Sequence, residues 1–362
     1  MYGGLGNRLP QLVNGVVLAL IANRTVLLEY PDYIRENWQF SLDFDSSNRE
    51  LGRQQVVVMD EKARDLISIS ITESLDNHFN DDKRGGIRTW VILGADYHVP
   101  YWQANPHYKE KLEALFPDGR IAHHVLRKTI RLKPELERAL SEYKSIHFRP
   151  YMIGIHVRTH NRHSDIGLMR TYAAIAEQLA MSSNRKHDVA FHLATDNIKV
   201  RQELEMWLGI NRTRHLNINF EEGNAMNNPG GSDVAAALDF MALATCDDVV
   251  ATHSSTFGHW AATLAGRPYT IVNLRQQDYR NSREVAFWRS ITSEPCSFLA
   301  KSFTQSPNAG SMNMSALEDE YQADLAAHNL TAIEEKREFR AISLLMQSKM
   351  YIHHTQCHFF VE

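Results

Sequence analysis

Two arginines are the residues in this chain best suited to hold an anion. Arg158 ends the apolar segment Met152–Arg158, and Arg162 follows in the next loop. A guanidinium offers a planar fork of N–H donors that meets phosphate oxygens in pairs and stays charged at any working pH. Arg158 is therefore suited to a diphosphate, although an ion pair with a nearby carboxylate is the alternative. His156, two residues earlier, would either contact a base or satisfy a hydrogen bond in the core.

A hydroxyl-rich turn is the second candidate for anion binding. Ser254, Ser255 and Thr256 stand between an apolar segment and a helix predicted from Trp260 to Leu264. The free N–H groups and the dipole of a helix both attract negative charge at its first turn. Ser255 and Thr256 are therefore candidate phosphate ligands. Ordinary capping of the helix by a hydroxyl side chain is the alternative.

The elements that must position these residues are short and apolar. Each segment is rich in Ile, Val or Leu, as buried parallel strands are, and amphipathic helices are predicted between them. The predicted strands are Met152–Arg158, Val189–Thr195, His215–Ile218, Asp248–Thr252 and Thr270–Leu274. In open parallel sheets, ligands bind beyond the carboxyl ends of the strands. This half of the chain is therefore predicted to be a Rossmann-like nucleotide-binding domain.

The first residues of the chain predict part of a second βαβ unit. A glycine-rich turn at residues 3–8 leads into a helix with an apolar face, and a strand is predicted at Thr25–Glu29. Glycine lets the backbone approach a ligand closely, and Asn7 and Arg8 add polar donors. A turn that only packs helix on sheet is the alternative. The strand that should precede this turn is missing, so we expect a trimmed N-terminus.

Length, charge and cysteine content indicate how many domains the chain has and which ligands it is suited to bind. A chain of 362 residues suggests two domains. The formal net charge of -4, without blocks of Lys or Arg, argues against nucleic acid. The three cysteines have no metal-ligand spacing. Asp43 and Asp45 have the spacing of an acidic pair that holds a divalent ion between phosphates, but a solvated turn is the favoured interpretation. We expect no metal.

The most apolar stretch, Leu9–Leu28, is interrupted by polar residues and carries a helical stripe, so it predicts core rather than membrane. We expect no signal peptide before it, because Met1 stands almost against the glycine-rich turn. Localisation stays open: a Golgi or secretory lumen if an N-terminal anchor has been trimmed, and the cytoplasm otherwise. At the other end, residues Ala316–Lys349 predict a long helix.

Four motifs together resemble the GDP-fucose-dependent fucosyltransferases. They are Gly-Gly-Leu-Gly-Asn-Arg at 3–8, Gly-Ile-His-Val-Arg at 154–158, Phe-His-Leu-Ala-Thr-Asp at 191–196, and the segment Asp239–Gly258. The nearest family is the plant-type xyloglucan α-1,2-fucosyltransferases, and α-1,6- and protein O-fucosyltransferases are similar more loosely. The resemblance covers residues 1–30 and 150–275.

The resemblance implies an α/β, GT-B-like fold in which two Rossmann-like domains face each other across a cleft. It implies a first, acceptor-side domain at 1–148, a GDP-fucose-binding domain at 149–300, and a helical C-terminal extension at 301–362. The implied activity is an inverting, metal-independent transfer of fucose from GDP-fucose to a hydroxyl of a glycan acceptor, as an α-1,2 linkage to galactose. A homodimer is a further expectation. The alternatives are another nucleotide sugar on the same fold and a non-catalytic glycan- or protein-binding module.

The resemblance also gives roles to individual residues. Arg158 matches the arginine that grips the β-phosphate and is the implied catalytic residue, and Asp239 matches the acidic residue that binds the guanine edge. The remaining implied donor-binding residues are Asn7, Arg8, His156, Arg162, Ser254, Ser255, Thr256 and Phe257. The loop after Arg158 departs from relatives that carry a second adjacent arginine, which puts the role of Arg162 in question.

Overall fold

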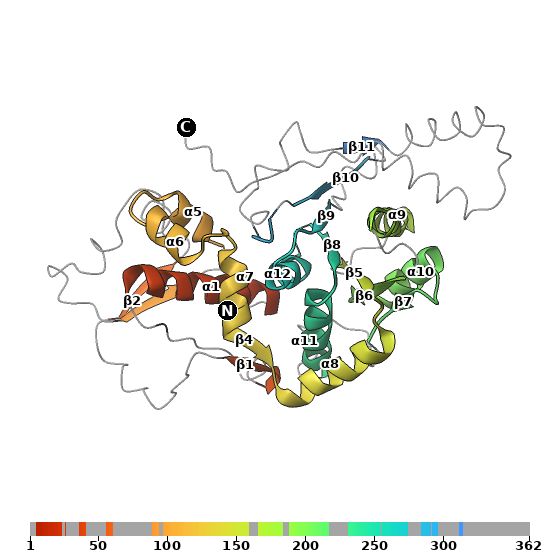
Figure 1. The fold of residues 1–362 in the computed structure, drawn as a ribbon, viewed down its shortest axis with the longest axis horizontal. Helices are drawn as coiled ribbons and strands as arrows, with labels where there is room; N and C mark the ends of the chain where they lie inside the picture. Colours follow the sequence, from red (N-terminus) through yellow and green to blue (C-terminus); the bar gives the residue numbers. More distant parts are fainter. Residues whose placement is uncertain are drawn as a thin grey trace. The chain divides into compact units, whose positions relative to one another are not determined.

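The computed structural model describes the chain in segments that form two compact units (Figure 1). The described residues are 5–23, 26, 36–40, 56–60, 89–93, 97–158, 166–183, 188–216, 231–253, 255–273, 284–290, 292–295 and 311–313. The first unit holds the described residues up to Lys133 together with Glu294 and residue 295. The second runs from Pro134 to Ser293 and includes 311–313.

The first unit combines helices with two small sheets. Its elements are α1 (Leu5–Ala22), β1 (Trp38–Phe40), β2 (Val56–Asp60), β3 (Thr89–Leu93), α5 (Val99–Ala104), α6 (Lys109–Leu115), α7 (Ile121–Thr129) and β4 (Ile130–Leu132). Strands β2 and β3 pair in parallel, whereas β1 and β4 pair antiparallel. The strand predicted at Thr25–Glu29 lies outside the described residues, apart from residue 26.

Helix α1 is the apolar helix that the sequence predicts, but it begins earlier. Gly6, Asn7 and Arg8 belong to its first turn, so their placement in a glycine turn before the helix was wrong. A glycine costs a helix about 1 kcal/mol relative to alanine, and burial of the apolar stripe that follows offsets this cost. Within the described part of the chain, α1 is the one helix long and apolar enough to cross a membrane, yet 56% of that window is buried. Such burial fits the predicted core helix.

The second unit is built on one large sheet. Its elements are α8 (Pro134–His147), β5 (Tyr151–Val157), α9 (Ile166–Ser182), β6 (Val189–Thr195), α10 (Ile198–Leu208), β7 (Thr213–Arg214), α11 (Gly231–Ala244), β8 (Asp248–Thr252), α12 (Thr256–Ala265), β9 (Thr270–Asn273), β10 (Glu284–Arg289) and β11 (Ser311–Asn313). The strand order is β11-β10-β9-β8-β5-β6-β7. Strands β5 to β9 pair in parallel, and β10 and β11 add antiparallel pairs.

Four of the five predicted parallel strands lie within a residue or so of their predicted bounds. The prediction of a strand at His215–Ile218 was wrong, because the third strand, β7, is the residue pair Thr213–Arg214. Its two residues pair with Phe191 and His192 of β6. Strand β10 was not predicted.

Strands β5 and β8 are parallel neighbours in the sheet, and the order in which successive strands are added reverses between them. From β5 the sheet continues through β6 and β7 on one side, and from β8 through β9 on the other. Ile153 pairs with Asp248 and His156 with Ala251, so both strands end at the same edge. Such a switch point, at the carboxyl ends of parallel strands, is where ligands bind in open α/β sheets.

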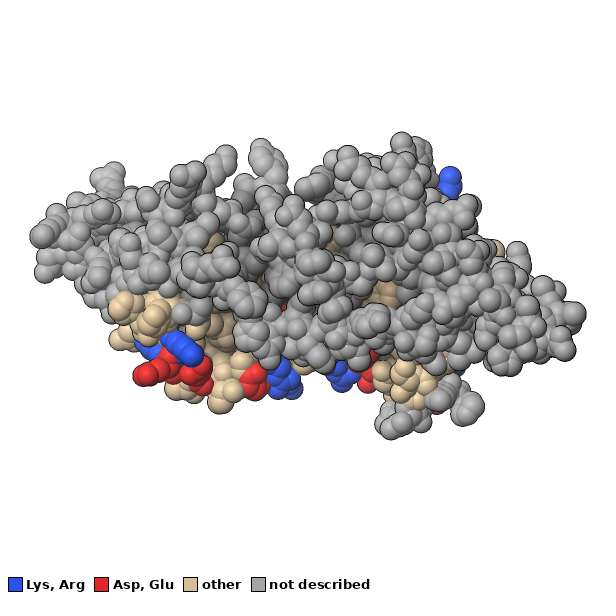
Figure 2. Space-filling view, turned by 90° about the horizontal axis from the view of Figure 1, so that it is seen from above, with Lys and Arg blue, Asp and Glu red and all other residues tan. Residues whose placement is uncertain are grey.

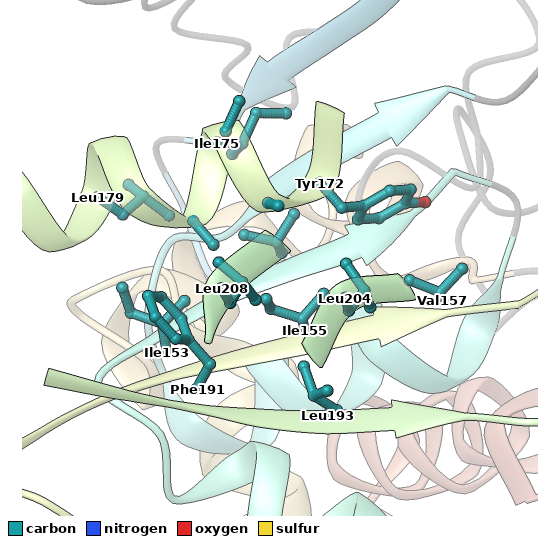
Figure 3. Close-up of a cluster of buried hydrophobic side chains, with 14 of the residues drawn as sticks. Ile153, Ile155, Val157, Tyr172, Ile175, Leu179, Phe191, Leu193, Leu204 and Leu208 are labelled. Carbon is teal, nitrogen blue, oxygen red and sulfur yellow. The ribbon is translucent and has the colours of Figure 1, made fainter. Parts of the chain in front are cut away.

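Alternation along β5 divides its residues between two buried layers. Ile153, Ile155 and Val157 face a core shared with α9 and α10, which Figure 3 shows with Tyr172 and Leu204. Residues Met152, Gly154 and His156 face the opposite layer, since successive strand side chains point to opposite faces. A strand buried on both faces needs apolar residues at almost every position. This double burial explains why β5 is recognisable from the sequence alone.

The predicted domain division at residue 148 stays a prediction. Helix α8 packs against α11 and falls in the second unit, which begins at Pro134. The predicted C-terminal helix at Ala316–Lys349 lies outside the described residues. On the face seen in Figure 2, most of the coloured Lys and Arg atoms lie beside Asp and Glu atoms, so the described residues show no large patch of one sign there. This mixture agrees with the small net charge.

Candidate nucleotide-binding site

A hydroxyl group ties the two strand ends together at the switch point. The side-chain oxygen of Thr252 accepts a hydrogen bond from the backbone N–H of Arg158 at 3.0 Å. The same hydroxyl donates a hydrogen bond to the carbonyl oxygen of His156 at 3.1 Å. The hydroxyl of Tyr172, from α9, lies 2.7 Å from the same oxygen. Because Thr252 has a single proton, Tyr172 must be the donor in that contact. Thr252 and Tyr172 were not predicted as site residues.

The side chain of Arg158 is ion-paired within the second unit. Its Nη1 lies 2.9 Å from Oδ2 of Asp196, which follows β6, and both side chains are about one-fifth exposed. The ion pair with a nearby carboxylate, given above as the alternative to diphosphate binding, is therefore present in the structure. A guanidinium carries five N–H donors in a rigid fork, so contact through Nη1 leaves it able to bind an anion as well. The pair fixes the guanidinium at the ligand-binding edge of the sheet.

The start of α12 is the second anion-binding feature at this edge. Ser255 occupies the N-cap position with extended backbone angles, φ -103° and ψ 107°, and is buried. Its side chain makes no capping hydrogen bond. The structure therefore lacks the ordinary side-chain cap that was the alternative to phosphate binding. Thr256 begins the helix, and Ser254 lies outside the described residues.

A buried histidine fastens this helix to the strand end. Nε2 of His259 lies 3.2 Å from the carbonyl oxygen of Thr252, and Nδ1 lies 3.4 Å from the hydroxyl of Tyr269. Burial, followed by the nearby His253, lowers the pKa of His259 to about 3. The ring is therefore neutral at any working pH. Its hydrogen bond to Thr252 holds the turn between β8 and α12 in place.

Aromatic rings and a glycine form the floor beside that turn. The rings of His156 and Phe257 lie 5.1 Å apart, and Phe257 meets Phe240 edge-on at 5.3 Å. A Cβ at Gly258 would lie 2.8 Å from both Ala251 Cβ and His156 Nδ1. Only glycine therefore allows α12 to approach the sheet this closely. His156 is buried, so it lies beneath the turn as part of this floor.

Asp239 stands on α11, over β6, where it faces a buried histidine. Its Oδ1 lies 3.3 Å from Nε2 of His192, whose side chain is fully buried, while 16% of the Asp239 side chain is exposed. His192 belongs to the Phe-His-Leu-Ala-Thr-Asp motif but was not predicted as a site residue. Its only sequence signal was a polar residue inside an otherwise apolar strand.

The remaining predicted site residues belong to the first unit or lie outside the described residues. Asn7 is exposed and Arg8 is buried in the first turn of α1, in the first unit. Arg162 lies outside the described residues, as do Asp43 and Asp45. Among the described residues, no group of three or more His, Cys, Asp or Glu side chains is arranged to hold a metal ion. The described site therefore consists of an arginine, a helix start and an acidic side chain.

The parallel strand order β7-β6-β5-β8-β9, with candidate anion-binding groups at its switch point, defines a Rossmann-like α/β unit. No protein-family model matches the chain. The sequence is 23% identical over 327 residues to a probable fucosyltransferase 9 of Arabidopsis thaliana, covering 81% of this chain and 64% of that relative's length. The similarity to fucosyltransferases that the motifs predicted is thereby confirmed. The chain spans less than two-thirds of that relative.

Solved structures give the same comparison at the level of the fold. An Arabidopsis thaliana FUT1 mutant in complex with GDP matches with a TM-score of 0.54 and 17% identity, covering 76% of this chain and 69% of that one. The fucosyltransferase NodZ from Bradyrhizobium matches with a TM-score of 0.48 and 15% identity, covering 78% and 94%. The first match confirms the predicted α/β, GT-B-like fold class.

Proposed function

We propose that the chain is an inverting fucosyltransferase that transfers fucose from GDP-fucose to a hydroxyl of a glycan acceptor, forming an α-1,2 linkage to galactose. The observation that carries the proposal is that Arg158 follows β5 and the start of α12 follows β8, two parallel strands that end at the same edge of the sheet at the switch point. The sequence relative is a probable fucosyltransferase, and FUT1 was solved with GDP. Both similarities support the same class of donor.

The chemistry requires stabilisation of the leaving diphosphate. Fucose leaves through an oxocarbenium-like transition state while negative charge builds on the β-phosphate. Donors that are already in place when this charge develops often supply the largest catalytic effect. The guanidinium of Arg158 and the helix start at Ser255 and Thr256 are such donors. This mechanism needs no metal, and the general base for the acceptor hydroxyl stays unassigned.

The structural elements explain why these donors stay in place. Thr252 holds the backbone of Arg158, Asp196 holds its side chain, and His259 holds the turn before α12. Each contact is made inside the second unit. The anion-binding groups are therefore fixed before the donor arrives, which avoids reorganisation when the bond breaks.

A thermal-shift panel of nucleotides tests the proposal. A ligand that binds the native state raises the melting temperature by mass action, so GDP should raise it, whereas UDP, CMP and ADP should not. An equal response to UDP would overturn the GDP assignment and favour a glycosyltransferase that uses another nucleotide sugar. Transfer of radiolabelled fucose from GDP-fucose to galactose-terminated xyloglucan fragments then tests the acceptor and linkage.

A further inference from the structure

Three polar side chains from three elements contact one another in sequence: Tyr143 and Asp239 are half-buried, and His192 between them is fully buried. The hydroxyl of Tyr143, on α8, lies 3.1 Å from Nδ1 of His192, on β6. Nε2 of the same ring lies 3.3 Å from Oδ1 of Asp239, on α11. Both atoms of this second contact are buried. They lie within ion-pair distance but are not aligned as a hydrogen bond, and neither has another hydrogen-bond partner in the described part of the chain. Each is therefore the main polar neighbour of the other.

The position of the proton on His192 follows from Tyr143. Burial, and after it the negative charge of Asp239, raise the pKa of the Tyr143 hydroxyl far above its ordinary value of 10. The hydroxyl therefore stays protonated and donates a hydrogen bond to Nδ1 of His192. In a neutral imidazole the other nitrogen must then carry the ring hydrogen. Nε2–H consequently faces the carboxylate of Asp239.

We propose that His192 and Tyr143 are positioning residues that hold one oxygen of Asp239, so that the site selects a purine with adjacent N–H donors on its Watson–Crick edge. This inference rests on the proposed GDP-dependent function, which assigns Asp239 to the base. His192 Nε2–H engages Oδ1, and the partly exposed carboxylate is thereby held in one orientation toward a ligand. The ring of His192 is clamped in turn by Tyr143 and lies edge-on to it, with centroids 5.9 Å apart.

The chemistry of the bases explains the selectivity. A carboxylate only accepts hydrogen bonds, and guanine presents N1–H beside its 2-amino group. Hypoxanthine keeps N1–H but lacks the amino group, and xanthine replaces that group with a carbonyl oxygen that a carboxylate repels. A site built around a buried polar group discriminates strongly against a ligand that leaves it unpaired. We therefore expect affinity to fall from GDP to IDP to XDP.

The first test measures the affinity ratio of GDP to IDP by calorimetry on the full chain. The wild-type protein should favour GDP about tenfold, the effect of one hydrogen bond to a charged group. His192→Phe and Tyr143→Phe should bring the ratio close to one, because Asp239 loses its orientation. His192→Gln should restore most of the preference, since its amide N–H can take the place of Nε2–H. Tyr151→Phe is the matched control. Tyr151 is the first residue of β5, at the end of the strand away from Arg158, and loss of its hydroxyl should leave the ratio of GDP to IDP affinity unchanged.

A second test uses the amide of asparagine as a reporter of orientation. In Asp239→Asn, the Nε2–H of His192 should hold the amide oxygen, which turns the NH₂ group toward the base. That group repels the guanine donors and donates a hydrogen bond to the 2-carbonyl oxygen of xanthine, so preference should shift from GDP to XDP by tenfold or more. In the double variant Asp239→Asn with His192→Phe, the amide has no orienting donor. The shift should then shrink to less than threefold.

The outcomes separate this inference from the donor assignment. A wild-type chain that binds no GDP, or binds UDP equally well, overturns the proposed function and the inference with it. A wild-type preference for GDP over IDP that survives in His192→Phe and Tyr143→Phe overturns the inference alone. Loss of the preference for GDP over IDP in both variants, with recovery in His192→Gln, supports the orientation of Asp239 by His192 and Tyr143. Tyr143→Phe removes one oxygen, so it keeps the test open if His192→Phe fails to fold.

Discussion

Arg158 and Asp196 form an ion pair, 2.9 Å between Nη1 and Oδ2, at the neighbouring carboxyl ends of β5 and β6. The contact joins a cation suited to a diphosphate with an anion that would oppose the same ligand. Both side chains are about one-fifth exposed, so the pair lies at the surface of the sheet edge. Measurements of kcat and melting temperature on variants of both residues therefore separate a structural role of Arg158 from a catalytic one.

Arg158→Lys should lower kcat far more than it weakens GDP-fucose binding. Lysine keeps the positive charge but loses the planar fork that meets phosphate oxygens in pairs. If the arginine acts on the transition state, the loss in kcat should be on the order of a hundredfold, and Arg158→Ala should lose more. Asp196→Asn keeps the arginine and should lose less. Equal melting-temperature losses in Arg158→Lys and Asp196→Asn, with turnover per folded molecule unchanged, would show a purely structural pair.

Fucose transfer should survive chelation of divalent metals. Arg158 and the start of α12 supply positive potential where the diphosphate is proposed to lie, so the charge on the leaving group is stabilised without a cation. Initial rates measured with and without EDTA should agree within a factor of about two, set by ordinary effects of ionic strength. Loss of activity that Mn²⁺ restores would contradict this prediction. It would direct attention to Asp43 and Asp45.

Gly258→Ala should destabilise the second unit and weaken GDP binding. An added Cβ would lie 2.8 Å from Ala251 Cβ and from His156 Nδ1, so α12 would have to move off the sheet. Overpacking of this kind costs about 1–3 kcal/mol. Helix propensity alone predicts the opposite sign, because alanine is favoured over glycine by about 1 kcal/mol. A higher melting temperature with unchanged GDP affinity would show that α12 is not held against the strand ends.

Glu294 should make the first unit less stable as pH rises from 4.5 to 7. This buried carboxyl accepts hydrogen bonds from the Tyr97 hydroxyl and, at 2.9 Å, from the backbone N–H of Ala122. Burial raises its pKa from 4.5 to about 7. Between these values the folded state holds a proton that the unfolded state has released, so stability falls with rising pH, by about 3 kcal/mol across the window.

Denaturation curves at several pH values measure this dependence. Glu294→Gln resembles the protonated acid and should flatten the slope between pH 4.5 and 7. Glu113→Gln is the matched control, because Glu113 is an exposed side chain of the same unit and its loss should leave the slope as it is. The same slope in Glu294→Gln as in the wild-type protein would contradict the assignment.

The amino-acid sequence by itself determined the segments that bury both faces. Strands β5, β6 and β8 were predicted within a residue because nearly every side chain in them is apolar. The end of α12 was predicted within a residue because Gly266 follows it, but the predicted start at Trp260 was wrong, since the helix begins at Thr256. Arg158, Asp239 and Ser255 were identified as candidates because their residue types and motif positions are local properties. Local patterns were less informative where an element is short or begins without a clear cap. The two-residue β7 and the start of α1 were therefore misplaced.

Only the tertiary structure decided which of these residues meet. Arg158 and Thr252 are hydrogen-bonded across 94 positions of sequence, and His192 faces Asp239 across two elements, because strand order places β5 between β6 and β8. Strand order and the choice of sheet face are set by packing of the whole sheet against its helices, and a periodic pattern within one segment does not specify them. The sequence therefore contained the chemical groups of the site, while the fold determined their pairings, their protonation and their orientation.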